Sequence, residues 1–213
     1  MPFKETFDPT DNIKAILDAY PFSIGLFREI LQNSDDAQAT KQTFLLDYRT
    51  HSHDGMKINH PRLAEIQGPA LLAYNDSEFQ EQDWGALQTV HSSSKRDDPS
   101  KIGKYGIGFR SCYHITDYPQ IISGNTLAIF DPQHNIFQDG GMDVALDDCG
   151  YGDVISAFGG ILGPSHVGPF EGTVFRFPLR TEDGGRISSK VVTAGETESL
   201  LKAFAKEELD IAE

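Results

Sequence analysis

The chain has 213 residues, 38% of them hydrophobic, which is enough for one large domain with a real core. Its 32 acidic residues outnumber its 18 basic residues and give a formal net charge of -14, which opposes binding to the phosphate backbone of a nucleic acid. The two cysteines lie far apart, the N-terminus has no apolar signal core and no segment is apolar enough to span a membrane, so we expect a cytoplasmic protein without nucleic-acid or membrane partners.

The first part of the chain predicts two helices and then two strands. Asp11 and Asn12 can cap a short helix that runs to Tyr20, and Pro21 separates it from SIGLFREILQNSDDAQAT, in which apolar residues recur at helical spacing. The two predicted strands are Lys41 to Arg49 and Pro69 to Asp76.

The middle of the chain predicts a helix, a loop, a glycine-rich turn and a hairpin. The helix covers Asp83 to Val90, and His91 to Lys101 has no periodicity and is predicted to be an exposed loop. The segment KIGKYGIGFRSCYHITD follows, in which three glycines give way directly to a helical pattern. Gly124-Asn125 then joins YPQIIS and NTLAIFD as a hairpin signal.

The last part of the chain predicts one strand and one helix. The segment from Gly140 to Gly172 is rich in glycine and aspartate and gives no clear prediction, whereas Gly172 to Arg180 alternates like a strand. The end, ETESLLKAFAKEELDIAE, is an amphipathic helix. We therefore expect a main domain over residues 1–180 and a helical extension over 181–213.

The order of the elements favours an α+β fold. Strands that come in adjacent pairs indicate a mixed, mostly antiparallel sheet, with helices on one face, as a two-layer α/β sandwich. A dinucleotide-binding reading of GKYGIG is disfavoured, because no strand directly precedes it.

Glu29, Asn33 and Asp36 are the first candidate site residues. Spacings of four and three place them on one face of the second helix. Carboxylate and amide oxygens suit Mg²⁺, and a nearby carboxylate can orient or deprotonate an attacking water. The alternative interpretation is a solvated polar helix face.

Three further motifs complete the pattern. Asp76 ends a strand, where its carboxylate can accept a hydrogen bond from an amine such as that of adenine. Gly106 and Gly108 leave room for a phosphate, which the amides of Ile107, Gly108 and Phe109 can contact at a helix start. Thr173 lies near the start of the last strand, where its hydroxyl can bond a base or a bridging water.

Two other groups of residues predict no site. His51, His53 and His60 share one loop without the acids or cysteines that a metal site needs, and a solvated loop is favoured. Cys112 is expected to be a buried packing residue.

In this order the motifs resemble the ATP-binding domain of the GHKL superfamily, which includes the ninety-kilodalton heat-shock chaperones, DNA gyrase B subunits, histidine kinases and MutL proteins. Within it the sequence is most similar to the chaperone-like module of sacsin and the plant No Vein proteins. The blocks that carry the similarity are LFREILQNSDDAQAT, QGPALLAYNDSEFQEQDW, SSSKRDDPSKIGKYGIGFRSCYHITDYP and LAIFDP, with GTVFRFPLR as a later match. The resemblance implies a sandwich of the Bergerat type and an ATP/ADP-binding, magnesium-dependent chaperone module, with client or co-chaperone proteins as partners.

The resemblance also implies roles for single residues. Glu29 takes the position of the general base, Asn33 that of the Mg²⁺ and phosphate ligand, with Asp36 beside it, and Asp76 that of the adenine-binding aspartate. Gly106 and Gly108 match the phosphate-contacting glycines. Ile107 lies between these two glycines and Phe109 follows them. Thr173 matches the threonine near adenine, and Ser92 to Lys101, including Lys95, matches the ATP lid.

The sequence departs from the superfamily after Asp76. A D-x-G-x-G signature is expected there, whereas this chain has Ser77, Glu78 and Phe79. The superfamily chaperones also complete catalysis with an arginine from a following domain, so we expect slow hydrolysis at most from this segment alone. The alternative hypothesis is an interaction scaffold that keeps the fold and binds no nucleotide.

Overall fold

The computed structural model describes residues 8–92, 107–147, 149–163, 166, 168–181 and 186–212. Its longer helices are α1 (Pro9–Ala19), α2 (Gly25–Asp36), α3 (Glu81–Ser92) and α7 (Ala194–Ala212), and the shorter helical segments are η1 (Leu63–Gln67), α4 (Ile107–Arg110), η3 (Ser111–His114), η4 (Cys149–Tyr151), α5 (Gly152–Ser156) and α6 (Gly159–Leu162). The strands are β1 (Gln42–Asp47), β2 (Ala70–Asn75), β3 (Gln120–Gly124), β4 (Thr126–Phe130), β5 (Gly141–Ala145) and β6 (Phe170–Pro178).

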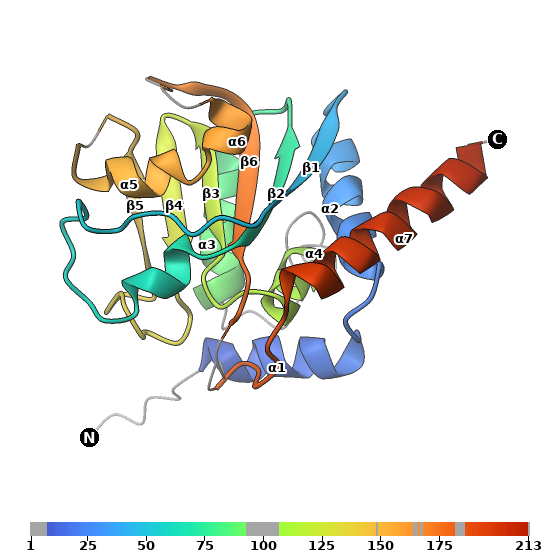
Figure 1. Cartoon of the computed structure of the whole chain (residues 1–213), viewed down its shortest axis with the longest axis horizontal. Coiled ribbons are helices and arrows are strands. Elements are labelled where there is room, and N and C mark those ends of the chain that lie inside the picture. The colour runs from blue at the N-terminus through green and yellow to red at the C-terminus, as the bar shows by residue number, and fades with distance from the viewer. Residues whose placement is uncertain are drawn as a thin grey trace.

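These strands form one sheet in the order β1-β2-β6-β3-β4-β5, and each described pairing is antiparallel (Figure 1). The last strand in the sequence, β6, therefore lies in the middle of the sheet between β2 and β3. The predicted α+β class and mostly antiparallel sheet are confirmed. The hairpin at Gly124-Asn125 is confirmed as well, because Ser123 pairs with Thr126 and Gly124 has a φ of 55°.

The longer helices cover one face of the sheet. Leu71 and Ala73 of β2 point to this side, into a core shared with α1, α2, α3, α4, η3 and α7. Their neighbours Ala70 and Leu72 point to the other side, where the chain between β1 and β2, η1, α5 and α6 form a second core. Because β2 is buried on both faces, its apolar run is nearly continuous rather than alternating.

Two local predictions differ from the structure, and one segment that gave no prediction forms regular structure. The first helix begins at Pro9, and its N-cap is Asp8, whose carboxylate accepts from the Thr10 amide at 2.9 Å, rather than Asp11 or Asn12. The helical pattern after the glycine-rich turn divides into the short segments α4 and η3. The region from Gly140 to Gly172, which gave no prediction, contributes β5, η4, α5 and α6.

Candidate functional site

Helix α2 carries the first candidate residues, and both apolar and polar contacts fix it to the sheet. Leu26, Phe27 and Ile30 are buried on the face toward the sheet. Near the end of the helix, the Ser34 hydroxyl accepts from the side-chain amide of Asn75, the last residue of β2, at 3.1 Å. These contacts fix the orientation of α2, so that the side with Glu29 and Asn33 faces Gly108 of α4.

Glu29 lies directly against Gly108. A Cβ atom built on Gly108 would overlap the Glu29 carboxylate oxygen Oε2, so only glycine leaves room for this approach of acid and backbone. Both residues line a cavity of about 140 Å³, together with Ser111 and His114 of η3. Burial lowers the pKa of His114 below its usual value, although the ring bonds the Tyr20 carbonyl. The exposed side chain of Glu29 and the imidazole ring of His114 therefore border this cavity.

Asn33 lies one turn further along α2, half-buried, and also faces Gly108. The space that these two residues share with Phe109, Cys112 and Phe175 has a volume of only about 10 Å³. Such a volume holds one water molecule at most. The structure thus brings Glu29, Asn33 and Gly108 together, with little free space behind them.

Asp76 lies elsewhere. Its carboxylate accepts from the Thr40 amide at 2.8 Å, the Thr40 hydroxyl at 2.5 Å and the Lys41 amide at 3.0 Å, and the side chain is exposed. The Thr40 hydroxyl bond is the main cause that lowers the pKa of Asp76. Asp76 therefore closes the turn between α2 and β1, and it lines neither of the two small cavities.

Asn75, one residue earlier, is the polar side chain that β2 presents to the helical face. It is 5% exposed and pairs across the sheet with Thr173 of β6. Sequence reasoning missed it, yet alternation gives a signal, because Leu71, Ala73 and Asn75 share one face of a strand. The side-chain oxygen of Asn75 also accepts from the Ser77 amide at 3.0 Å and so ends the strand.

Thr173 is fully buried in a small hydroxyl network. Its Oγ1 donates to the Ser77 carbonyl at 2.8 Å and lies 2.8 Å from the Ser123 hydroxyl. The Ser123 hydroxyl accepts in turn from the Phe79 amide at 2.8 Å. These bonds hold the segment after β2 against the sheet.

Phe79 occupies the space above Thr173 and β6. Its ring packs edge-on against Trp84 of α3, with centroids 5.0 Å apart, and against Phe175 at 5.9 Å. Phe175 continues the contact to Phe109 at 6.0 Å. Glu78, by contrast, is exposed and lies over Gly124 of the hairpin. Aromatic rings thus fill the region between β6, α3 and α4.

The other candidate residues divide into two groups. Asp36 is exposed at the last position of α2, and Ile107 begins α4. Of the predicted lid from Ser92 to Lys101, the structure describes only Ser92, which ends α3; the rest, with Lys95, and Gly106 lie outside the described residues.

Further observations concern metal ligands, membrane-spanning helices and the residues for which the sequence predicted no site. Among the described residues, no group of three or more His, Cys, Asp or Glu side chains is arranged to hold a metal ion, and no helix there is long and apolar enough to cross a membrane. Cys112 is 1% exposed, as predicted, and burial raises the pKa of its thiol well above the usual value. The His51 ring nitrogen Nε2 lies 2.9 Å from the Asp47 carboxylate.

Comparison with known proteins gives two matches. A family model described as the sacsin domain matches residues 6–211, which is nearly the whole chain. Human sacsin is 36% identical over 214 residues, which cover 95% of this chain and 5% of sacsin itself. The chain therefore corresponds to a small part of that relative's length. It belongs to the sacsin domain family.

Proposed function

We propose that this chain is an ATP/ADP-binding module of a sacsin-like molecular chaperone, dependent on Mg²⁺ and capable of slow hydrolysis at most by itself. The observation that carries the proposal is the contact of Glu29 with Gly108, because it places the candidate general base directly beside the glycine that the motif assigns to the phosphates. The half-buried Asn33 on the same side of α2 adds an oxygen ligand of the kind that Mg²⁺ accepts.

The residues at this end of the site suit the phosphates and the metal. Asn33 would hold Mg²⁺ through its side-chain oxygen, and Glu29 would take a proton from water at its exposed carboxylate. When bound, the ion would neutralise charge on the phosphate oxygens. The amide of Phe109 would provide a hydrogen-bond donor to a phosphate beside Gly108.

The base end suits a nucleotide less well. Phe109 and Phe175 line the space of about 10 Å³ behind Asn33, and Phe79 packs against Phe175, so an adenine could enter there only if this aromatic cluster rearranged. This packing favours a second candidate function, an interaction scaffold without a nucleotide. The two candidates differ in a single measurable property, the affinity for ADP.

A calorimetric titration of ADP into the protein, with and without Mg²⁺, tests the proposal. We expect saturable binding that requires Mg²⁺ and is lost in Asn33→Ala. Glu29→Ala is expected to bind ADP but to hydrolyse no ATP. Asp35→Asn is the matched control, since Asp35 is an exposed acid on the same helix that belongs to neither cavity.

Two variants identify the residue that contacts the base. The motif predicts that Asp76→Asn abolishes binding, whereas the burial of Asn75 opposite Thr173 predicts that Asn75→Ala does so. If only one of the two variants loses ADP binding and its thermal unfolding midpoint is unchanged, the residue replaced in that variant is the one that contacts the base. No heat of binding at millimolar ADP in any of these proteins would refute the proposal and favour the scaffold.

A further inference from the structure

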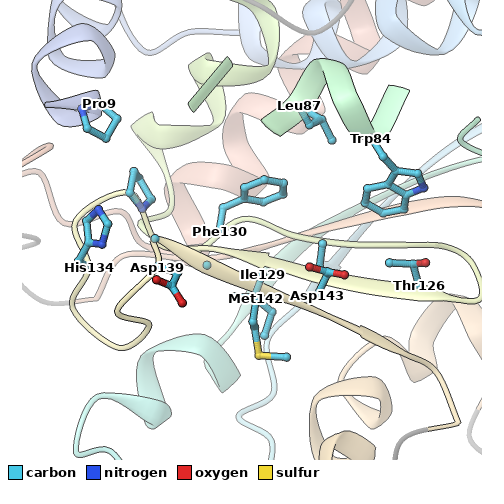
Figure 2. Close-up of a pocket in the computed structure, with 14 residues that line it drawn as sticks. Pro9, Trp84, Leu87, Thr126, Ile129, Phe130, His134, Asp139, Met142 and Asp143 are labelled. Carbon is cyan, nitrogen blue, oxygen red and sulfur yellow. The ribbon is translucent and has the colours of Figure 1, made fainter. Parts of the chain in front are cut away.

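Another, much larger cavity lies between α3 and the outer strands β4 and β5 (Figure 2). Its volume is about 610 Å³, which lies within the range of ligand-binding pockets. We call it the α3 groove and define it by the residues that line it: Pro9, Trp84, Leu87, Thr126, Ala128, Ile129, Phe130, Pro132, His134, Asp139, Gly140, Gly141, Met142 and Asp143.

The groove exists because small residues lie below α3. Ala128 pairs with Asp143 and Phe130 pairs with Gly141, so β4 and β5 contribute one methyl group and one glycine to the floor of the groove. Gly141 cannot be replaced, since a Cβ there would contact the Ile129 carbonyl oxygen at 2.5 Å. A hollow of this size lined by apolar groups leaves contact energy unused, which an occupant would recover.

The walls of the groove are apolar and its charges are negative. Leu87 is buried, and Trp84 and Phe130 are half-buried, so their exposed parts offer apolar surface. Asp139 and Asp143 are exposed, and neither has an ion-pair partner within the described parts of the chain. With a net charge of -14 on the whole chain, this surface favours a ligand that is both apolar and positively charged.

The shape of the groove favours an extended ligand. In Figure 2, Asp139 lies at one end with Pro9 and His134, whereas Asp143 lies toward the other end, where Trp84 and Thr126 are found. β5, which carries Asp143, pairs only with β4 in the described sheet and so offers backbone hydrogen-bond groups along its outer edge. An extended peptide can use such an edge, while a compact amine cannot.

We propose that the α3 groove binds an extended peptide segment that combines apolar side chains with arginine or lysine. The apolar side chains lie against Trp84, Leu87 and Phe130, and the basic side chains pair with Asp139 and Asp143. This binding needs no nucleotide and stands independently of the function proposed above.

Trp84 provides the readout, because it is the only tryptophan of the chain and lines the groove. The probe is the synthetic peptide acetyl-Leu-Arg-Phe-Lys-Leu-Arg-amide, titrated without nucleotide while tryptophan emission is recorded. We expect a saturable change, and at least tenfold weaker binding of the same peptide with glutamate at each basic position.

Variants of the groove give the decisive comparison. Asp143→Asn removes one charge, and Ala128→Leu fills the hollow, so each is expected to weaken binding at least tenfold. Asp147→Asn is the control, since it makes the same change at an exposed acid outside the groove. Circular dichroism checks that each variant folds. If Ala128→Leu does not fold, Asp143→Asn still tests the proposal, because Asp143 is exposed and its replacement removes no buried contact.

Three results would overturn the proposal. The first is the absence of a saturable change at millimolar peptide. The second is equal affinity in Asp143→Asn and the unaltered protein. The third is binding of phenethylammonium as tight as that of the peptide, which would indicate a site for small amines.

Discussion

At the scale of single residues, Phe79 belongs to the aromatic cluster that packs next to the candidate site. The two glycines of the superfamily signature fall on Glu78 and Gln80 in this chain, and Phe79 between them carries a ring that is 9% exposed and contacts both Trp84 and Phe175. Its amide is fixed by Ser123, so the backbone cannot move aside easily. The nucleotide-binding hypothesis therefore requires the aromatic cluster that contains Phe79 to rearrange when ADP binds, whereas the scaffold hypothesis requires it to stay in place.

We predict that Phe79→Ala raises the affinity for ADP in the presence of Mg²⁺ and lowers the free energy of unfolding by about 3 kcal/mol, because it replaces a packed ring by a cavity. Calorimetry and chemical denaturation measure the two effects. Phe44→Ala is the control, since Phe44 contacts Phe27 and Phe204 instead. A Phe79→Ala protein that folds and still binds no ADP would argue for the scaffold.

At the scale of elements, the segment after β6 is fastened to the turn after η3 by Arg180. Its guanidinium pairs with the buried Asp117 carboxylate at 2.8 Å and donates to the carbonyls of Tyr113 and Thr116. Burial raises the pKa of Asp117, and the ion pair with Arg180 opposes that rise. Since α4 and η3 carry Gly108 and His114, this ion pair also holds one wall of the candidate site.

We predict that Arg180→Met lowers the free energy of unfolding by about 3–5 kcal/mol, because it leaves a buried carboxylate without its partner. The double variant Arg180→Met/Asp117→Asn is expected to recover part of this loss, since no buried charge then remains. Urea denaturation of the three proteins measures the coupling. Equal losses in the single and double variants would show that Asp117 does not need its partner.

At the scale of the whole molecule, the C-terminal helix α7 packs on the domain beside α2 and β1 (Figure 1). Phe204 of α7 is 6% exposed and stacks on Phe27 of α2, with centroids 5.4 Å apart. Arg28 of α2 adds exposed ion pairs with Glu207 and Glu208. The predicted division at residue 180 stays a prediction, but α7 shares its core with the residues before it.

We predict that Phe204→Ala lowers the free energy of unfolding by about 3–5 kcal/mol through the loss of buried aromatic contacts. Arg28→Gln, which removes only exposed ion pairs, is expected to change it little, because solvent screens such pairs. Thermal and chemical unfolding compare the two variants. A loss as small for Phe204→Ala as for Arg28→Gln would mean that α7 does not stabilise the domain.

Local patterns in the sequence were enough for much of the fold. Periodicity gave α2 and its buried face, the alternation of β6 and the amphipathic α7, and the dipeptide at Gly124-Asn125 gave the hairpin. The same helical spacing predicted that Glu29 and Asn33 share one side of α2, and the order of the motifs placed the glycine-rich turn with Gly108 later in the chain. These features depend on neighbours in the chain, where spacing and turn chemistry act directly.

The tertiary structure decided what depends on distant partners. The order of the strands places β6 between β2 and β3, and their register pairs Asn75 with Thr173. The contact of Asp76 with Thr40 likewise joins residues that are far apart in the sequence. β5, α5 and α6 arise from a glycine- and aspartate-rich segment without periodicity, because their apolar residues are buried only against the second face of the sheet. The sequence by itself thus determined the elements and the order of the motifs, whereas packing between distant segments decided which side chains meet and where a groove remains.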